Sequence, residues 1–230
     1  MDSQKFLFGD GHHSLAGCIF DPSGVGVSRP GVLFIHGQNS SQKAYEERAR
    51  IASRDLDAIC MTFDLSGHGY DAPNFERYSV YDHLDDVVTA YDYLAAHDAL
   101  DQTRIGVCGA SYGGYLAALL TAHRAVKRLI LRAPALSKDI AFPVRPTAKG
   151  LPHEVPDGFD SLQVLGRYPG EVLMVESEND EVIPASHITA YLLASPHAQH
   201  QVIPEAGHAL TNPTWDEVFV KAIVNWFREL

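Results

Sequence analysis

Short apolar runs alternate with longer amphipathic segments along most of this sequence, and this alternation limits the possible folds more than any other feature. Runs such as Gly31–Gly37 and Ala58–Asp64 are apolar almost throughout, which is typical of strands buried on both faces. Segments with helical periodicity follow them. Because such an alternation requires crossover connections, we predict the α/β class, with a mostly parallel, doubly wound sheet of about eight strands flanked by helices.

The expected elements follow one another in a regular order. We predict strands at 6–8, 15–20, 31–37, 58–64, 104–109, 128–133, 171–176 and 200–204, the first two forming an edge hairpin. We predict helices at 40–54, 81–97, 112–123, 184–193 and 215–230. Residues 134–170 break this rhythm, with prolines at 134, 143, 146, 152 and 156. We interpret them as a short insert within one domain that spans residues 1–230.

Composition excludes several classes of function. The chain has 18 Lys and Arg against 29 Asp and Glu, a net charge of −11, which argues against nucleic acid as a partner because phosphate backbones require basic surface. No apolar stretch has the length of a membrane span or of a signal peptide, so we expect a cytoplasmic protein without a membrane partner. Cys18, Cys60 and Cys108 lie in apolar runs, and we expect buried, reduced thiols.

The segment Gly109-Ala110-Ser111-Tyr112-Gly113 carries the strongest chemical signal in the chain. A G-x-S-x-G pattern is weak alone, but here it joins an expected strand to an expected helix, which is the position of a nucleophile elbow. Such a turn forces the serine into a strained backbone conformation and leaves no room for side chains two positions away. We therefore predict Ser111 as a nucleophile raised above the sheet, at the positive end of a helix dipole.

A serine nucleophile needs a histidine base, which a carboxylate orients. Among the 12 histidines, His208 follows the last expected strand and so lies at the sheet edge that would carry Ser111. Asp180 follows the strand at 171–176 and is our candidate acid, with Glu178 and Glu176 as rivals. The resulting chain order of serine, aspartate and histidine is one of the known arrangements of a catalytic triad.

Two main-chain N–H groups are candidates for an oxyanion hole. The residue after the nucleophile, Tyr112, supplies one of them. The loop after the third strand supplies the other, because Gly37 allows the chain to turn so that the N–H of Gln38 faces the site. We interpret His36 as a structural residue that holds this loop through a ring hydrogen bond.

These motifs together resemble the serine-nucleophile esterases and lipase-like members of the α/β-hydrolase superfamily. The likeness extends over nearly the whole sequence and includes His36-Gly37, the loop at 64–69, the elbow at 109–113, Asp180 and Gly207-His208. It implies the α/β-hydrolase fold with Ser111, Asp180 and His208 as catalytic residues and with no metal or organic cofactor. The insert at 134–170 stands where such relatives carry a cap over the active site.

The shortness of this insert leaves room only for a small lid, which suits compact substrates. We name Phe142, Leu151 and Phe159 as candidate substrate-binding residues within it, although packing against the domain would equally explain them.

The expected activity is hydrolysis of a small-molecule carboxylic ester through an acyl-enzyme intermediate. A thioesterase and a peptidase similar to prolyl-oligopeptidase catalytic domains would use the same triad and remain alternatives. A non-catalytic binding protein on the same fold is a third, which the retention of all three triad residues disfavours. The identity of the ester and the choice between monomer and dimer stay open.

Overall fold

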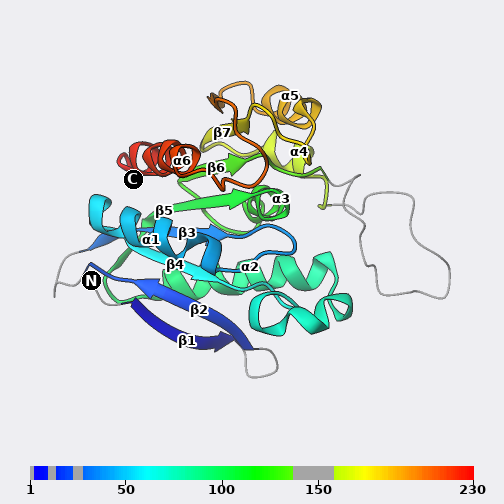
Figure 1. Cartoon of the computed structure of the whole chain (residues 1–230). Helices are drawn as coiled ribbons and strands as arrows, with labels where there is room; N and C mark the ends of the chain where they lie inside the picture. The colour runs from blue at the N-terminus through cyan, green and yellow to red at the C-terminus, as the bar shows by residue number, and fades with distance from the viewer. Residues whose placement is uncertain (1–2, 10–13, 23–27, 137–157) are drawn as a thin grey trace.

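The computed structural model describes residues 3–9, 14–22, 28–136 and 158–230 (Figure 1). Its strands are β1 (Ser3–Gly9), β2 (Ser14–Phe20), β3 (Arg29–Ile35), β4 (Ile59–Phe63), β5 (Leu100–Ala110), β6 (Arg128–Arg132), β7 (Glu171–Ser177) and β8 (Gln199–Ile203). Its helices are α1 (Lys43–Leu56), α2 (Val80–Ala95), α3 (Tyr112–Leu120), α4 (Ser161–Leu165), α5 (Ala185–Ala194) and α6 (Pro213–Phe227), with a 3-10 segment η1 at Gly69–Arg77.

All eight strands belong to one sheet, in the order β1-β2-β4-β3-β5-β6-β7-β8. The pairs β1–β2 and β2–β4 are antiparallel, and the remaining pairs are parallel. This confirms the predicted α/β class and the edge hairpin. Because the parallel strands from β3 to β8 all end at one edge, the loops that follow β3, β5, β7 and β8 meet there.

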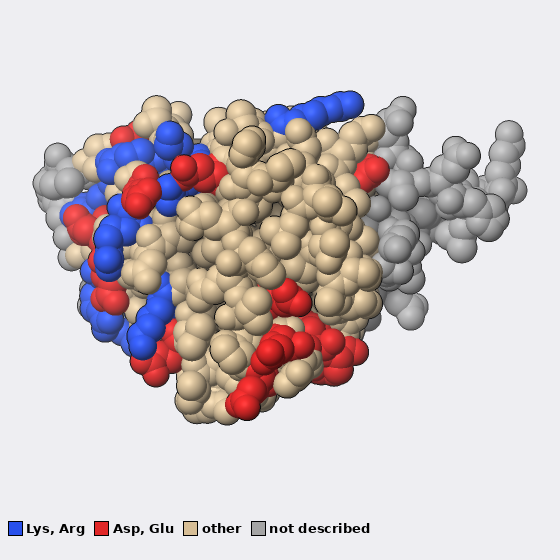
Figure 2. Space-filling view, turned by 90° about the horizontal axis from the view of Figure 1, so that it is seen from above, with Lys and Arg blue, Asp and Glu red and all other residues tan. Residues whose placement is uncertain are grey.

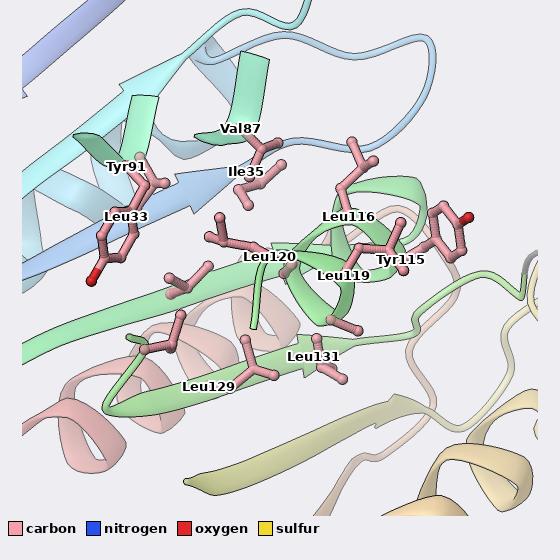
Figure 3. Packing of buried hydrophobic residues seen from close by; sticks show 14 of the residues in the cluster. Leu33, Ile35, Val87, Tyr91, Tyr115, Leu116, Leu119, Leu120, Leu129 and Leu131 are labelled. Atoms are coloured by element: carbon pink, nitrogen blue, oxygen red, sulfur yellow. The ribbon is translucent and has the colours of Figure 1, made fainter. Parts of the chain in front are cut away.

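Helices cover both faces of the sheet (Figure 1). One buried cluster lies under α1 and α6, and a larger one lies between the sheet and the helices α2 to α5. Figure 3 shows the larger cluster, in which leucines of α3 lie among side chains of β3, α2 and β6. The three cysteines are buried and free, as predicted, and burial raises the pKa of the Cys108 thiol to about 12.

Helix termini account for two small differences from the expected bounds. The last helix begins at Pro213, two residues before the predicted start, because the side chain of Asn212 accepts a hydrogen bond from the Thr214 N–H at 2.9 Å and caps it. Helix α2 begins after Ser79, which forms a reciprocal capping box with Asp82. Among the described residues, no helix is both long and apolar enough to cross a membrane.

Candidate active site

Ser111 occupies the turn between β5 and α3, and its backbone has the strained conformation that an elbow requires. Its φ is 54° and its ψ is −122°, a region that residues with a Cβ rarely adopt. The Ser111 N–H donates to the Arg132 carbonyl at 2.9 Å, and the Ser111 carbonyl accepts from the Ala135 N–H at 3.0 Å. The last residue of β6 and the chain just after it therefore hold both polar groups of the Ser111 backbone.

The elbow has no room for a side chain at Gly109 or at Gly113. A Cβ on Gly109 would lie 2.3 Å from the carbonyl oxygen of Gly113. A Cβ on Gly113 would lie 2.4 Å from the carbonyl oxygens of both Ile35 and His36. Backbone atoms cannot yield by that much, so only glycine fits at these positions. The tight contact places the first turn of α3 directly against the end of β3.

The loop after β3 lies close to the Ser111 side chain. A Cβ on Gly37 would lie 3.2 Å from the Cβ of Ser111 and 3.8 Å from its Oγ, so the backbone at Gly37 passes close to the serine side chain. Gln38 follows and is exposed, and Tyr112 contributes the first N–H of α3, which has no acceptor within the helix. The oxyanion roles of the Gln38 and Tyr112 N–H groups stay predictions.

His208 and Asp180 contact each other through their side chains. The Nδ1 of His208 lies 3.0 Å and 2.9 Å from the two carboxylate oxygens of Asp180. One of these oxygens also accepts hydrogen bonds from the N–H groups of Val182 and Ile183. Burial would raise the pKa of Asp180, but the hydrogen bonds outweigh that effect and hold its pKa below the ordinary value. Asp180 therefore remains a carboxylate that fixes the tautomer of His208.

The two rival acids have other partners. Glu178 accepts a hydrogen bond from the N–H of Glu205 at 2.8 Å, and Glu176 pairs with His200 at 2.8 Å. His200 lies on β8 at the edge of the sheet. Of the three carboxylates considered, the structure joins Asp180 to the His208 ring.

Two residues that the sequence did not single out hold the backbone of His208. Glu181 accepts a hydrogen bond from the His208 N–H at 3.0 Å, and a Cβ on Gly207 would lie 3.0 Å from the same carboxylate. The Arg132 guanidinium donates to the His208 carbonyl oxygen. Both contacts end on main-chain atoms, and no spacing in the sequence signals such a partner.

Three buried histidines, His36, His68 and His83, lie close together next to the loop that follows β3. His36 has Nδ1 at 2.8 Å from the Gly37 carbonyl and Nε2 at 3.0 Å from the Leu65 N–H, so it is a neutral ring with its proton on Nδ1. His83 contacts the Ser66 carbonyl and the Tyr112 hydroxyl, and the His68 ring lies between His36 and His83. Burial lowers the pKa of His36 to about 4. The predicted structural role of His36 is thus supported by its contacts.

The three candidate substrate-binding residues are placed only in part. Phe142 and Leu151 lie outside the described residues. Phe159 is half-buried; its ring contacts that of Tyr81 with centroids 4.5 Å apart, and its carbonyl accepts a hydrogen bond from the Tyr115 hydroxyl. These contacts secure Phe159 against α2 and α3, and its role toward a substrate stays a prediction.

Solved structures share the fold. The carboxylesterase EstE1, cloned from a metagenomic library, superposes with a TM-score of 0.76 at 17% identity, over 99% of this chain and 88% of that one. Est1E from Butyrivibrio proteoclasticus, solved with ferulic acid bound, gives 0.72 at 19% identity over 94% and 95%. DcsB, solved with a substrate analogue, gives 0.77 at 16% identity over 99% of both chains. The protein therefore has the α/β-hydrolase fold.

Two sequence relatives extend the comparison. An uncharacterised protein of Mycobacterium tuberculosis is 26% identical over 188 residues, which are 81% of this chain and 66% of that protein. Dipeptidyl peptidase 8 of Homo sapiens is 24% identical over 94% of this chain, which spans only 27% of that much longer protein. A family model described as the prolyl oligopeptidase family matches residues 80–230, which include the elbow, Asp180 and His208. With that match covering well over half of its length, the chain belongs to the prolyl oligopeptidase family.

Proposed function

We propose that this protein is a serine hydrolase that cleaves carboxylic esters with small or compact acyl and alcohol groups. The observation that carries the proposal is the pairing of His208 with Asp180 at the same sheet edge as the strained Ser111. The likeness in fold to EstE1 and Est1E supports the choice of an ester. The Asp180 contact occupies Nδ1 of His208, which leaves Nε2 as the nitrogen that exchanges protons with Ser111.

The reaction would proceed in two halves. Ser111 Oγ attacks the ester carbonyl while His208 Nε2 accepts the hydroxyl proton, and the main-chain N–H groups of Gln38 and Tyr112 stabilise the oxyanion. Collapse breaks the bond to the alcohol, which leaves with the proton from His208. Water then attacks the acyl-enzyme, giving its proton to His208, and the acid is released as the proton returns to Ser111.

A peptidase is the second candidate, because the family that the chain belongs to and the likeness to dipeptidyl peptidase 8 both point to amide cleavage. The same triad serves both reactions. An amide requires stronger protonation of its leaving group, so the two functions differ in the relative rate toward an ester and an amide of the same acyl group.

The test compares wild type with Ser111→Ala on p-nitrophenyl acetate and butyrate, and on acyl-CoA. Each p-nitrophenyl ester is paired with the p-nitroanilide of the same acyl group, and dipeptidyl p-nitroanilides complete the set. We expect ester hydrolysis by wild type and a loss of at least ~10³-fold in kcat for the variant, because the nucleophile is removed. Equal ester rates in both proteins would refute the proposal. A preference for the anilides would establish the peptidase, and a preference for acyl-CoA the thioesterase.

A further inference from the structure

Arg132 contacts all three chain segments that carry the proposed triad. It is the last residue of β6, and its carbonyl accepts the hydrogen bond from the Ser111 N–H. Its Nη2 donates to the Ser177 hydroxyl at 3.1 Å and to the carbonyl oxygen of His208. The Ser177 carbonyl in turn accepts from the Asp180 N–H at 3.2 Å. Arg132 thus connects the elbow to two loops: the acid loop, which follows β7 and carries Asp180, and the base loop, which follows β8 and carries His208.

The guanidinium of Arg132 is buried at a cost that its partners offset only in part. Arg132 is 7% exposed, and burial lowers the pKa of its guanidinium. Its hydrogen-bond acceptors are a hydroxyl and a carbonyl, and its Nε has no hydrogen-bond partner among the described residues. Apolar residues that replace a buried charge often leave a protein as stable or more stable. The guanidinium also lies 5.9 Å from the centre of the Phe219 ring, so a cation–π contact offsets part of the cost of burial.

The contact to His208 completes a set of three restraints on that residue. Asp180 holds the ring, Glu181 holds the N–H, and Arg132 holds the carbonyl. With both main-chain polar groups and Nδ1 restrained, the direction of Nε2 is determined. A base loop fixed in this way keeps the proton acceptor aligned with a serine that β6 also holds.

We propose that Arg132 is a positioning residue, which sets the place of His208 relative to Ser111 by holding the base loop and the elbow on one strand end. This inference rests on the proposed serine-hydrolase function. It predicts that loss of the guanidinium misaligns the base while leaving the substrate-binding surface in place, so that kcat falls and KM does not rise.

Arg128 offers a matched control within the same strand. It lies four positions earlier, so its side chain is on the same face of the sheet, and it is also buried, at 6% exposed. Its guanidinium donates to the Trp226 carbonyl at 2.7 Å, ion-pairs with Glu229 and lies 4.5 Å from the centre of the Trp226 ring. Arg128 thus contacts α6 and the residues that follow it at the strand end remote from Ser111, and it also pairs with Glu171 of β7.

The experiment compares Arg132→Met, Arg132→Lys and Arg128→Met with wild type. For each, kcat and KM are measured on p-nitrophenyl butyrate, the rate of labelling by a fluorophosphonate is measured, and Tm is recorded. We expect Arg132→Met to lose about 10- to 100-fold in kcat and in labelling rate with KM unchanged, since misplacement of a reacting group by about 1 Å can cost about 10²-fold. Arg132→Lys retains one donor for the His208 carbonyl and should recover part of the loss. Arg128→Met should lower Tm and leave kcat unchanged.

The outcomes separate the positioning role from general stability and from the function itself. Unchanged kcat and labelling in Arg132→Met, or equal losses in Arg128→Met, would overturn the positioning role. If Arg132→Met does not fold, Arg132→Lys carries the test: a kcat equal to that of wild type at a lower Tm overturns the role. If wild type reacts with the fluorophosphonate but not with esters, the ester proposal fails and labelling rates still decide on Arg132. If wild type does not react at all, both proposals fall.

Discussion

Ser111 illustrates how local strain and long-range contacts work together at a single residue. A positive φ at a residue with a Cβ costs on the order of 1–3 kcal/mol, and such a conformation persists only where the surroundings determine it. Here two backbone hydrogen bonds, to Arg132 and from Ala135, hold the elbow from the neighbouring strand end. The strained turn is therefore a property of the folded sheet and not of the five-residue motif.

Asp180→Asn should reduce kcat by about 10⁴-fold on p-nitrophenyl butyrate, because an amide in place of the carboxylate favours the wrong tautomer of His208. The matched control is Glu178→Gln, two positions earlier in the same loop. Its carboxylate accepts from the Glu205 N–H, and the amide oxygen of glutamine can do the same, so kcat should stay within about twofold of wild type. A larger loss in Glu178→Gln than in Asp180→Asn would move the acid role to Glu178.

The sequence predicts the residues of the proposed triad better than the residues that hold them in place. Ser111 and His208 follow from residue type and place in the expected order of strands, and the contact between His208 and Asp180 agrees with the expected pair. Arg132 and Glu181 could not be found in this way, because each contacts a main-chain atom of His208. Nearly every residue has a main-chain carbonyl and N–H, so a side chain that contacts these groups cannot be recognised from a sequence motif.

Among the elements, the packing of α3 against β3 is the contact that positions Ser111 most directly. The helix approaches so closely that the Gly113 position lies against the carbonyls at the end of β3. The α3 leucines fill the layer between β3 and β6 on the same side of the sheet (Figure 3). Any displacement of α3 from β3 therefore moves Ser111 relative to Gly37.

Gly113→Ala should destabilise the protein by at least about 2 kcal/mol, because its Cβ would overlap backbone oxygens that cannot move without shifting β3. Gly114→Ala provides the comparison, since its Cβ would meet the Pro134 ring at 3.1 Å, where a shift of a few tenths of an ångström suffices. Urea unfolding measures both free energies. Equal free energies of unfolding for the two variants would show that α3 and β3 are packed less tightly than a 2.4 Å clash at Gly113 requires.

The order of elements was predictable from periodicity, but the 3-10 segment was not. Residues Gly69–Arg77 lack a repeated apolar face of sufficient length. The strand order was also hidden: β4 pairs on one side of β3 and β5 on the other, which depends on long-range packing. Strand β5 extends from Leu100, earlier than the expected 104, where Leu100 pairs with Arg29 beyond an irregularity in the ladder.

Charged side chains are unevenly distributed over one face of the molecule. On the face shown in Figure 2, Lys and Arg side chains gather on one side among acidic ones, a group of Asp and Glu lies at the lower edge, and uncharged surface fills most of the middle. Some of the basic residues form ion pairs with acidic ones, as Arg48 does with Asp216. The net charge of −11 reflects 29 Asp and Glu against 18 Lys and Arg, and some of these basic residues are paired with acids.

Stability should fall as the pH drops from 6.5 toward 4. Burial lowers the pKa values of His36, His68 and His83, so the unfolded chain binds protons in this range that the folded protein does not. For His36, whose pKa falls to about 4, the free energy of unfolding should decrease by on the order of 1 kcal/mol per pH unit over this range, and His68 and His83 contribute in the same direction. Urea unfolding at several pH values measures the slope.

His36→Asn should flatten this slope, because asparagine does not titrate and its amide can still donate to the Gly37 carbonyl. The control is His197→Asn, at an exposed position, which should leave the slope as in wild type. A stability that is constant between pH 7 and pH 5 in wild type would contradict the neutral, buried state of these rings.

The positions of the proposed triad residues along the chain bear on when the site is completed during folding. Ser111 precedes His208 by most of the second half of the sequence, and β6, β7 and β8, which are neighbours in the sheet, lie between the two residues along the chain. Parallel pairing of this kind is slow, because loops must close before contacts form. A chain in which β8 has not docked would lack the contact of His208 with Asp180 beside Ser111, so we expect recovered turnover on refolding to report on the completion of the sheet and not on the early formation of helices.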